Sequence, residues 1–330
     1  MKELLRVAVV GTGSAGQHHL EAFGEIDGVQ PVAVSPRSVR REALSSAGHR
    51  TAVDITEAAG MGATLAVIAT NTGEHVRDGM AALEAGCDVL VEKPLSVDAT
   101  EAAKLLAVSE ADGRKLYVAC VLRFSESLNA FRSMLSRIGC PHAVQIECRS
   151  YLPDWRANRP YQETYSTDPV QGGVLRDLIH EVDYAAWLFG WPSSVIASLR
   201  NAGRLGIQSE ELADLAWETT DGCRVSLSLD YITRTSRRRM TAFGDAGTLE
   251  WDGVRGSVFF ESANGQKENC ESAQTRSEMF IAQARAFVAS ASGSTGRQPA
   301  TGADGIRALA VCDAARTASN NGSKEKVYYR

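Results

Sequence analysis

Short apolar runs alternate with longer amphipathic stretches in the first part of the chain. The runs are continuous, rich in β-branched residues and bounded by glycine or polar residues, which is typical of strands buried on both faces of a sheet. We expect strands over residues 4–10, 31–35, 65–70, 88–92 and 116–121.

The stretches between these runs have helical periodicity. They cover residues 15–23, 39–47, 74–85 and 97–111. Gly86 directly follows the third stretch, where a glycine favours the end of a helix. Strands that alternate with helices predict a parallel, doubly wound α/β sheet.

The pattern changes after about residue 122. Polar and apolar residues alternate over longer runs, which predicts a mostly antiparallel sheet with one solvated or interface face. We expect strands over residues 143–151, 194–201, 213–220, 223–232 and 239–251, with helices over 126–138, 173–189, 277–290 and 301–319. The predicted domains are a dinucleotide-binding domain, 1–122, and an α+β domain for substrate binding and oligomerisation, 123–330.

Composition narrows the class of protein. Hydrophobic residues make up 44% and charged residues 23% of 330 residues, which suits a globular chain of two domains. The net charge of −5 disfavours nucleic-acid binding. The seven cysteines are scattered without a C-x-x-C pair, so we expect no metal site and a reducing compartment. With no signal-peptide pattern and no membrane-length apolar run, we expect a cytoplasmic protein.

A glycine-rich turn follows the first predicted strand and opens the first predicted helix. Gly11-Thr12-Gly13-Ser14-Ala15-Gly16 has the G-x-G-x-x-G spacing of dinucleotide-binding turns. Gly11 permits the tight turn, Gly13 lets a pyrophosphate approach the backbone, and Gly16 allows close helix–strand packing. Together with the free N–H groups of Ser14 and Ala15 at the helix start, these residues predict a cofactor site. The alternative is a purely structural turn.

The end of the second strand bears on the choice between NAD and NADP. An acid there would favour NAD, but the chain has Ser35, Arg37 and two further arginines, Arg40 and Arg41. A hydroxyl and a guanidinium suit a 2′-phosphate, so we favour NADP slightly. The arginines could instead be a solvated helix start, or the loop could accept both cofactors.

Glu92-Lys93-Pro94 follows the 88–92 strand. A lysine at the carboxyl end of a strand faces the crevice where α/β sheets bind ligands. A cis bond before Pro94 could direct this lysine.

These pieces together resemble the Gfo/Idh/MocA oxidoreductases, the relatives of glucose–fructose oxidoreductase and inositol dehydrogenase. The matching segments are VAVVGTGSAGQHH at the start, ATNTGEH at 69–75, EAGCDVLVEKPLS at 84–96, LRF at 122–124 and GGVLRDLIHEVDYAAWLFG at 172–190. The resemblance implies a Rossmann domain, a second domain with an open sheet, and homodimers or homotetramers through that sheet. It also implies hydride transfer between NAD(P) and a hydroxyl or carbonyl carbon of a sugar, polyol or nucleotide-sugar derivative.

The resemblance also implies residue roles. Lys93 would contact the reacting hydroxyl, and Asn71 matches the segment that lines the nicotinamide ribose. Thr70, His75, Glu92 and Lys93 itself complete the expected cofactor set. His75 could instead serve only to begin its helix.

The predicted helix 173–189 carries the candidate proton-transfer groups. On a helical wheel Asp177, His180, Glu181 and Tyr184 share one face, opposite the apolar residues. We hypothesise that His180 exchanges the proton, Asp177 orients the substrate or its partner, and Lys93 polarises the reacting oxygen. The alternative is a solvated acidic face with an incidental histidine. The family often places this histidine four residues after the aspartate rather than three, which leaves Asp183 as a weaker candidate.

The aromatic and arginine-rich stretch 151–161 is the candidate substrate loop. Aromatic faces pack on sugar rings and arginines bind anionic groups, so Trp155 and Arg156 predict substrate contacts. The alternative is a surface loop in which these side chains stack on each other. Arg123, at the predicted domain junction, could reach the same pocket.

The remaining charged residues and histidines do not indicate an RNA-binding or a metal site. We expect the basic run of Arg234, Arg237, Arg238 and Arg239 to be an exposed loop, and His18 and His19 to face solvent or the cofactor rim. Two other functions stay open. The chain could be a non-catalytic NAD(P)- and sugar-sensing protein, or a glycosidase that uses bound NAD transiently.

Overall fold

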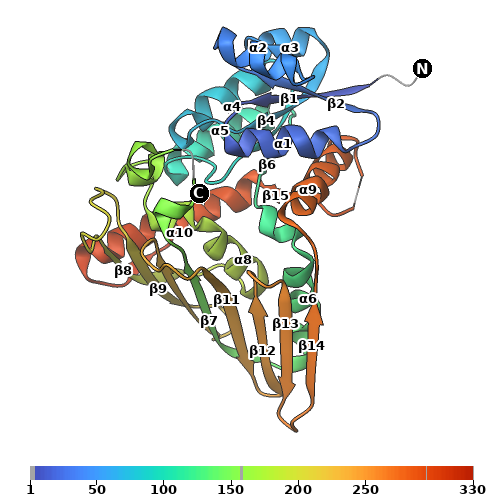
Figure 1. Cartoon of the computed structure of the whole chain (residues 1–330). Coiled ribbons are helices and arrows are strands. Elements are labelled where there is room, and N and C mark those ends of the chain that lie inside the picture. The colour runs from blue at the N-terminus through green and yellow to red at the C-terminus, as the bar shows by residue number, and fades with distance from the viewer. Residues whose placement is uncertain (1–3, 157–158, 295, 330) are drawn as a thin grey trace. The chain divides into compact units, whose positions relative to one another are not determined.

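The computed structural model describes residues 4–156, 159–294 and 296–329 (Figure 1). The chain forms two compact units. The first contains residues up to Phe124 together with Thr275–Ile306, and the second contains Ser125–Gln274 together with the rest of the chain from Arg307.

The sheet of the first unit is parallel except at one edge. Its order is β15-β6-β5-β4-β1-β2-β3, and only β15 runs antiparallel to its neighbour. The strands are β1 Leu5–Val10, β2 Val29–Val34, β3 Arg50–Ala52, β4 Ala63–Ile68, β5 Asp88–Val91, β6 Leu116–Val118 and β15 Ala300–Thr301. This is the predicted doubly wound Rossmann sheet, so the fold class is confirmed.

Helices connect these strands largely as predicted. They are α1 Ser14–Gly24, α2 Ser38–Ser46, α3 Ile55–Gly60, α4 His75–Glu84 and α5 Ala99–Ala111, with 3₁₀ turns η1 Thr72–Glu74 and η2 Val121–Phe124. The short elements β3 and α3 were not predicted. The aspartate before α3, Asp54, accepts a hydrogen bond from the Glu57 N–H and so caps this helix.

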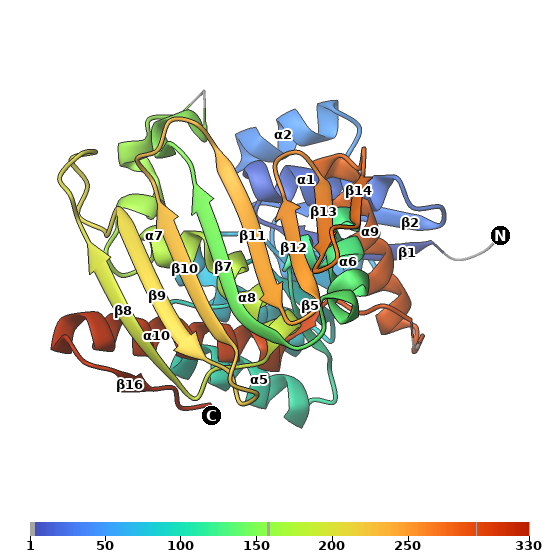
Figure 2. The same ribbon diagram turned by 90° about the horizontal axis from the view of Figure 1, so that it is seen from below.

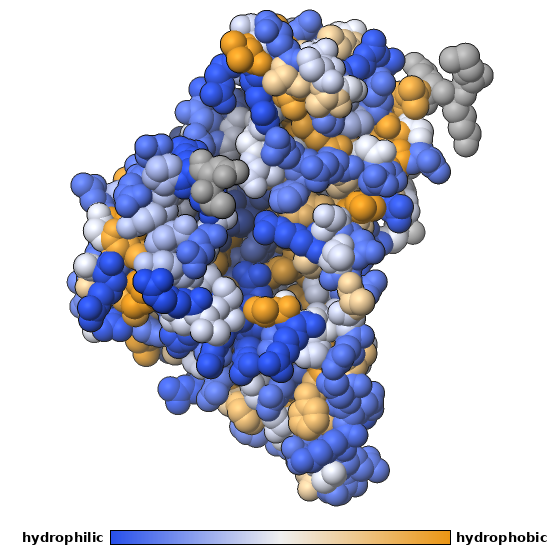
Figure 3. Space-filling view, viewed as in Figure 1, coloured by the Kyte–Doolittle hydropathy of each residue, from blue (hydrophilic) through white to orange (hydrophobic). Residues whose placement is uncertain are grey.

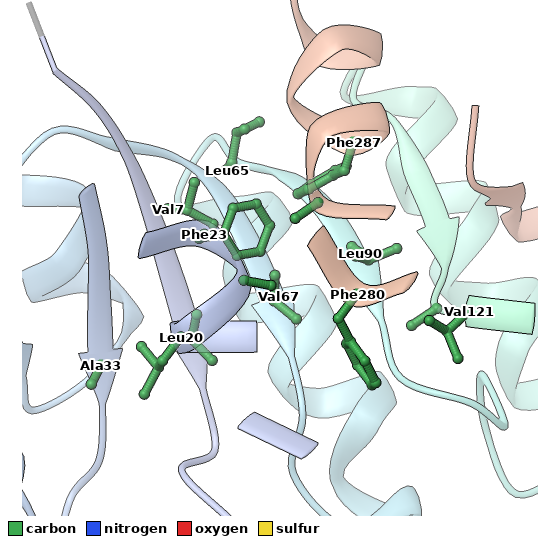
Figure 4. Close-up of a cluster of buried hydrophobic side chains, with 14 of the residues drawn as sticks. Val7, Leu20, Phe23, Ala33, Leu65, Val67, Leu90, Val121, Phe280 and Phe287 are labelled. Atoms are coloured by element: carbon green, nitrogen blue, oxygen red, sulfur yellow. The ribbon is translucent and has the colours of Figure 1, made fainter. Parts of the chain in front are cut away.

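A helix from late in the sequence completes the core of the first unit. Helix α9, Arg276–Ala291, begins at a capping box formed by Thr275 and Glu278. Its buried Phe280 and Phe287 join Phe23 and strand residues in one apolar cluster (Figure 4). The structure therefore differs from the predicted 123–330 domain, because residues 275–306 belong to the first unit.

The second unit is built on a nine-stranded sheet of order β14-β13-β12-β11-β7-β10-β9-β8-β16 (Figure 2). The strands are β7 Pro141–Arg149, β8 Ser194–Arg200, β9 Leu212–Glu218, β10 Arg224–Asp230, β11 Arg237–Gly244, β12 Gly247–Asp252, β13 Ser257–Ser262, β14 Lys267–Glu271 and β16 Glu325–Lys326. Only the β7–β10 pair is parallel. The mostly antiparallel sheet was predicted.

Two details of this sheet were predicted incorrectly. Residues 239–251 are not one strand, because a turn between Gly244 and Gly247 divides them into β11 and β12. Strands β13, β14 and β16 were missed. Strand β14 is exposed along its whole length, so it lacks the apolar alternation that identifies a strand. Figure 3 shows the corresponding hydrophilic surface at the β13–β14 end of the sheet.

The helices of the second unit include α6 Glu126–Met134, α7 Val174–Asp177 and α8 Ile179–Phe189. Helix α10, Gly302–Asn321, begins in the first unit and continues into the second. Between α6 and α7 the chain also forms short 3₁₀ turns, which are η3 Leu135–Ile138, η4 Leu152–Asp154, η5 Tyr161–Glu163 and η6 Tyr165–Thr167. None of the helices in the described ranges combines the length and apolarity needed to cross a membrane.

Candidate active site

Four loops of the first unit lie at one edge of its sheet. They follow β1, β2, β4 and β5, which run parallel, so their carboxyl ends share that edge. The loops begin at Gly11, Ser35, Ala69 and Glu92. The connections reverse direction between β1 and β4, the position where doubly wound sheets bind ligands.

The glycine turn has the geometry that its sequence predicted. Gly11 has a φ of +91°, and a Cβ there would lie 2.6 Å from the carbonyl carbon of Ala69. A Cβ on Gly16 would overlap the carbonyl oxygen of Gly11, so close packing requires this glycine. A Cβ on Gly13 would meet no atom within 4 Å. The turn is therefore closely packed at Gly11 and Gly16, whereas the space next to Gly13 is open.

The start of α1 suits an anionic group. Its N-cap residue, Gly13, has no side chain to accept a hydrogen bond from the helix. The first turn, which contains Ser14 and Ala15, has no acidic residue that would repel an anion. The side-chain hydroxyl of Thr70 is buried and has no hydrogen-bond partner among the described residues. Free N–H groups beside a buried hydroxyl without a partner fit a phosphate-containing nicotinamide cofactor.

Three arginines surround the end of β2. Arg37 is exposed at the N-cap of α2, next to Ser35, which is buried. Arg40 reaches the glycine turn, where its Nε lies 3.1 Å from the Thr12 Oγ1 and its Nη2 lies 2.6 Å from the Thr12 carbonyl oxygen. Arg41 donates to the carbonyl oxygen of Ser35. The loop is thus cationic and has no acid between Ser35 and Arg41.

The loop after β5 is tied to the loop after β4. The Lys93–Pro94 peptide bond is cis. His75 is buried, and its ring nitrogens lie 2.8 Å from the Pro94 carbonyl oxygen and 3.2 Å from that of Thr70. Burial lowers the pKa of His75, so its ring is neutral and donates one N–H. His75 therefore begins α4 and also joins the two loops, whereas Asn71, in the loop after β4, is exposed.

Of the two expectations for His19, solvent or the cofactor rim, the first was wrong. Instead of facing solvent it is 1% exposed, and its Nε2 lies 2.8 Å from the Oε1 of Glu92. Burial alone would raise the pKa of Glu92, but the His19 hydrogen bond and the charges of His19 and Lys93 outweigh burial and lower it. Glu92 is therefore ionised. No sequence signal separated His19 from the half-buried His18.

In the second unit, the helix with Asp177 and His180 is interrupted. Leu178 has φ −99° and ψ 32°, so α7 ends at Asp177 and α8 begins at Ile179. The predicted continuous helix with a polar face is therefore wrong. Asp177 is 2% exposed and His180 is 9% exposed. Asp183 is also buried, so neither aspartate is a solvated residue.

Asp177 has a partner that the sequence did not reveal. The hydroxyl of Tyr231, just after β10, lies 2.5 Å from the Asp177 Oδ2. Burial, followed by the charge of Asp177, raises the pKa of Tyr231 well above its ordinary value, so the phenol donates. The ring of Trp155 packs edge-on against Tyr231 at 5.4 Å, and its Nε1 donates to Ser150.

The basic run is the expected exposed loop only at Arg234, which lies exposed between strands. Residues 237–239 begin β11, and the Arg238 Nε lies 2.8 Å from the Oε1 of Glu181, which is fully buried. The wheel had placed Glu181 on the polar face, opposite the residues expected in the core. Tyr184, from the same predicted face, is fully buried against Trp251.

Two further candidates contact neighbours in their own units. The guanidinium of Arg156 lies 5.7 Å from the ring centre of Tyr165, outside the 151–161 stretch, whereas Trp155 packs on Tyr231. These contacts differ from the mutual stacking of Arg156 and Trp155 that the alternative assumed. Ala157 and Asn158 of that loop lie outside the described residues. Arg123 is buried, and its Nη1 lies 3.1 Å from the Oδ2 of Asp304. Within the described ranges, no group of three histidine, cysteine or acidic residues could hold a metal ion.

Two family models match the chain. One, described as an oxidoreductase family with an NAD-binding Rossmann fold, covers residues 5–120. The other, a GFO/IDH/MocA C-terminal domain, covers residues 132–250. Together the matched ranges include more than half of the chain.

Similar proteins include a myo-inositol dehydrogenase from Streptomyces leeuwenhoekii, 27% identical, with 97% of this chain and 98% of that protein covered. The rhizopine catabolism protein MocA from Rhizobium meliloti is 29% identical, with 94% and 93% covered. Among solved structures, levoglucosan dehydrogenase in complex with NADH has a TM-score of 0.88 at 18% identity, with 99% of this chain and 100% of that chain covered. At this identity the last likeness shows the fold alone.

Proposed function

Because the chain belongs to the GFO/IDH/MocA oxidoreductase family, we propose that it oxidises a hydroxyl carbon, or reduces a carbonyl carbon, of a sugar, polyol or nucleotide-sugar derivative. The observation that carries this proposal is the common sheet edge shared by the glycine turn, the Thr70 hydroxyl and Lys93. The name of the myo-inositol dehydrogenase that resembles this chain supports the substrate class.

The proposed roles divide between the two units. A bound nicotinamide supplies a hydride acceptor or donor. Lys93 polarises the reacting oxygen, and His180 takes up or returns the hydroxyl proton. Asp177, fixed by Tyr231, orients the substrate or His180. Thr70, Asn71, His75 and Glu92 complete the cofactor contacts, while Arg123, Trp155 and Arg156 remain candidate substrate contacts.

Turnover with a panel of polyols, sugars and nucleotide sugars tests this function. A dehydrogenase accumulates reduced nicotinamide in proportion to oxidised substrate. A glycosidase with transient redox chemistry releases a cleaved product without net change in the cofactor. Cofactor binding without any substrate conversion would support the sensing alternative and contradict the proposal.

Substitution of the two proton-handling groups tests their roles. Lys93→Ala and His180→Ala should each lower kcat by about 10²–10⁴-fold, the usual contribution of acid–base groups, while cofactor affinity is retained. Lys104→Ala and His142→Ala are matched controls, because both side chains are exposed. Near-normal kcat in either site variant would remove that residue from the mechanism.

We also propose a slight preference for NADP over NAD, which rests on Ser35 and the exposed Arg37. Arg37→Ala should weaken NADP binding by about 10–100-fold, the loss of one charge-assisted hydrogen bond, and leave NAD binding nearly unchanged. Arg40→Ala should weaken both cofactors alike, because Arg40 holds Thr12 in the glycine turn. Titrations with each reduced cofactor measure the effects, and equal losses for Arg37→Ala would contradict the preference.

The second sheet supports a proposal of homodimers or homotetramers. Its strands alternate buried residues with exposed or half-exposed ones, such as Gln145 and Glu147 on β7 and Ile196 on β8. Ile196 is 55% exposed, which is unusual for a large apolar side chain in a strand. Ile196→Glu should shift sedimentation towards monomer, whereas Val254→Glu, in a turn, should not. A monomeric wild-type protein would contradict the proposal.

A further inference from the structure

A chain of hydrogen bonds runs from the first helix to the main chain of Lys93. The Nε2 of His19 on α1 lies 2.8 Å from the Oε1 of Glu92, and the Lys93 N–H donates to the Oε2 at 3.1 Å. We propose that His19 is a positioning residue for Lys93 and links the glycine-turn helix to it through Glu92. The importance of Lys93 rests on the proposed function.

The surroundings of Glu92 support a positioning role. Its side chain is 13% exposed and its pKa is lowered, so a charged carboxylate lies largely out of water. Such a group requires charge-assisted or strong hydrogen bonds, and two donors on different oxygens fix the plane of the carboxylate. Without the His19 bond, the Lys93 N–H would remain as a donor to this carboxylate, and that donor is local to the same loop.

The ring of His19 is itself fixed. It packs edge-on against Phe280 at 5.2 Å and stacks at 6.5 Å with Phe23, both members of the apolar core of the first unit. A donor held in a rigid core can set the position of a loop, whereas a mobile surface side chain cannot. His19 therefore connects Glu92 to the apolar core of the first unit.

His75 supports the opposite side of the same segment. Its Nδ1 lies 2.8 Å from the Pro94 carbonyl oxygen, while its helix, α4, follows a different strand. Residues 92–94 are thus held by two buried histidines. Of these, His19 comes from the helix that begins at the glycine turn, so it fixes Lys93 relative to that turn.

The alternative is that His19 only fills space in the core. His19→Leu removes the donor and keeps an apolar side chain of similar bulk. His19→Gln keeps a donor near the position of Nε2. His18→Leu is the matched control, because His18 lies on the same helix and also contacts Phe280, but the carboxylate that it approaches, Glu21, is exposed and 3.9 Å away.

Two measurements separate positioning from space filling. Hydrogen exchange in overlapping peptides that isolate the Lys93 amide should be faster in His19→Leu, because Glu92 no longer holds its orientation. The same variant should lower kcat by about 10–100-fold, the cost of a small misplacement, with little change in cofactor affinity. His19→Gln should recover both values to within a few-fold, and His18→Leu should match the wild type.

Each outcome decides the question. Unchanged Lys93 exchange in His19→Leu would overturn the proposal. If exchange in His19→Leu increases throughout the first unit, His19→Gln distinguishes the two roles. A side-chain donor should restore the protection of the Lys93 amide if His19 positions Lys93, but not if His19 only fills space. If the wild type converts no substrate, the proposed function fails. The exchange data would then still decide whether His19 positions Lys93.

Discussion

The phenol of Tyr231 donates a 2.5 Å hydrogen bond to the carboxylate of Asp177, and both side chains are buried. Tyr231 follows β10 directly, whereas Asp177 ends α7. The bond therefore fixes the end of a four-residue helix to the end of a sheet strand. A short helix has little stability of its own, so this contact determines where the Asp177 carboxylate lies.

Tyr231→Phe should destabilise the protein by about 1.5–3 kcal/mol, since a hydrogen bond to a charged, buried group is lost. It should also lower kcat/KM, because Asp177 loses its orientation. Tyr184→Phe is the matched control. The Tyr184 hydroxyl is buried and has no hydrogen-bond partner among the described residues, so its removal should be neutral or stabilising. Urea denaturation measures the stability of each variant, and steady-state kinetics measure kcat/KM. Equal stabilities of the two variants would contradict a stabilising hydrogen bond between Tyr231 and Asp177.

The sequence could predict the candidate cofactor loops more fully than the surroundings of Asp177 in the second unit. Buried strands followed by a glycine turn and by Glu92-Lys93-Pro94 are local patterns, and parallel topology brings them to one edge. The pairing of Asp177 with Tyr231 joins residues 54 positions apart. No local pattern encodes that contact.

The helical wheel failed for a specific reason. It assumed a continuous helix from 173 to 189, but Leu178 interrupts the helix between Asp177 and His180. It also placed Glu181 on the face opposite the residues that pack in the core. Glu181 is polar and fully buried because Arg238 of β11 neutralises it, and this strand lies far along the chain. Tertiary partners of this kind override a local hydrophobic pattern.

Arg238→Met should destabilise the protein by about 3–5 kcal/mol, because it leaves the buried charge of Glu181 without its partner. Arg239→Met is the control on the next residue of the strand. Its pair with Asp252, at 3.3 Å, is half exposed, and such surface pairs contribute about 0–1 kcal/mol. Adding Glu181→Gln to Arg238→Met should recover part of the loss. Equal effects of the two arginine variants in urea denaturation would show that Glu181 does not depend on Arg238.

Alkaline pH should destabilise the protein through its buried thiols. Burial raises the pKa of Cys87 to about 11 and the pKa values of Cys148 and Cys312 to about 12. Unfolded thiols ionise near pH 8.5, so above that pH the unfolded state binds fewer protons and the free energy of unfolding falls. The contribution is complete below about pH 8.5 and is lost as pH rises towards the folded pKa values.

Cys312→Ala should make the free energy of unfolding fall less steeply as pH rises. Between pH 8 and pH 10 the variant should lose about 2 kcal/mol less unfolding free energy than the wild type, as expected for one thiol. Cys270→Ala is the control, because Cys270 is exposed. Urea denaturation at the two pH values gives the change in unfolding free energy between them. Removal of the Cys312 thiol also leaves a cavity, but its cost is the same at both pH values and cancels in this difference. A slope identical to the wild type would mean that the Cys312 thiol ionises equally in both states.

The glycines of the turn should separate folding from cofactor binding. Gly16→Ala should destabilise the protein by about 1–3 kcal/mol, the usual cost of overpacking, because its methyl group would overlap the Gly11 carbonyl oxygen. Gly13→Ala should leave thermal stability unchanged, since its φ of −74° suits alanine and its methyl group would meet no atom within 4 Å. That open space is where a pyrophosphate would approach the turn, so Gly13→Ala should weaken binding of the reduced cofactor by about tenfold or more. Fluorescence titration measures the affinity. Wild-type affinity in Gly13→Ala would place the phosphates elsewhere, whatever the stability of the Gly16 variant.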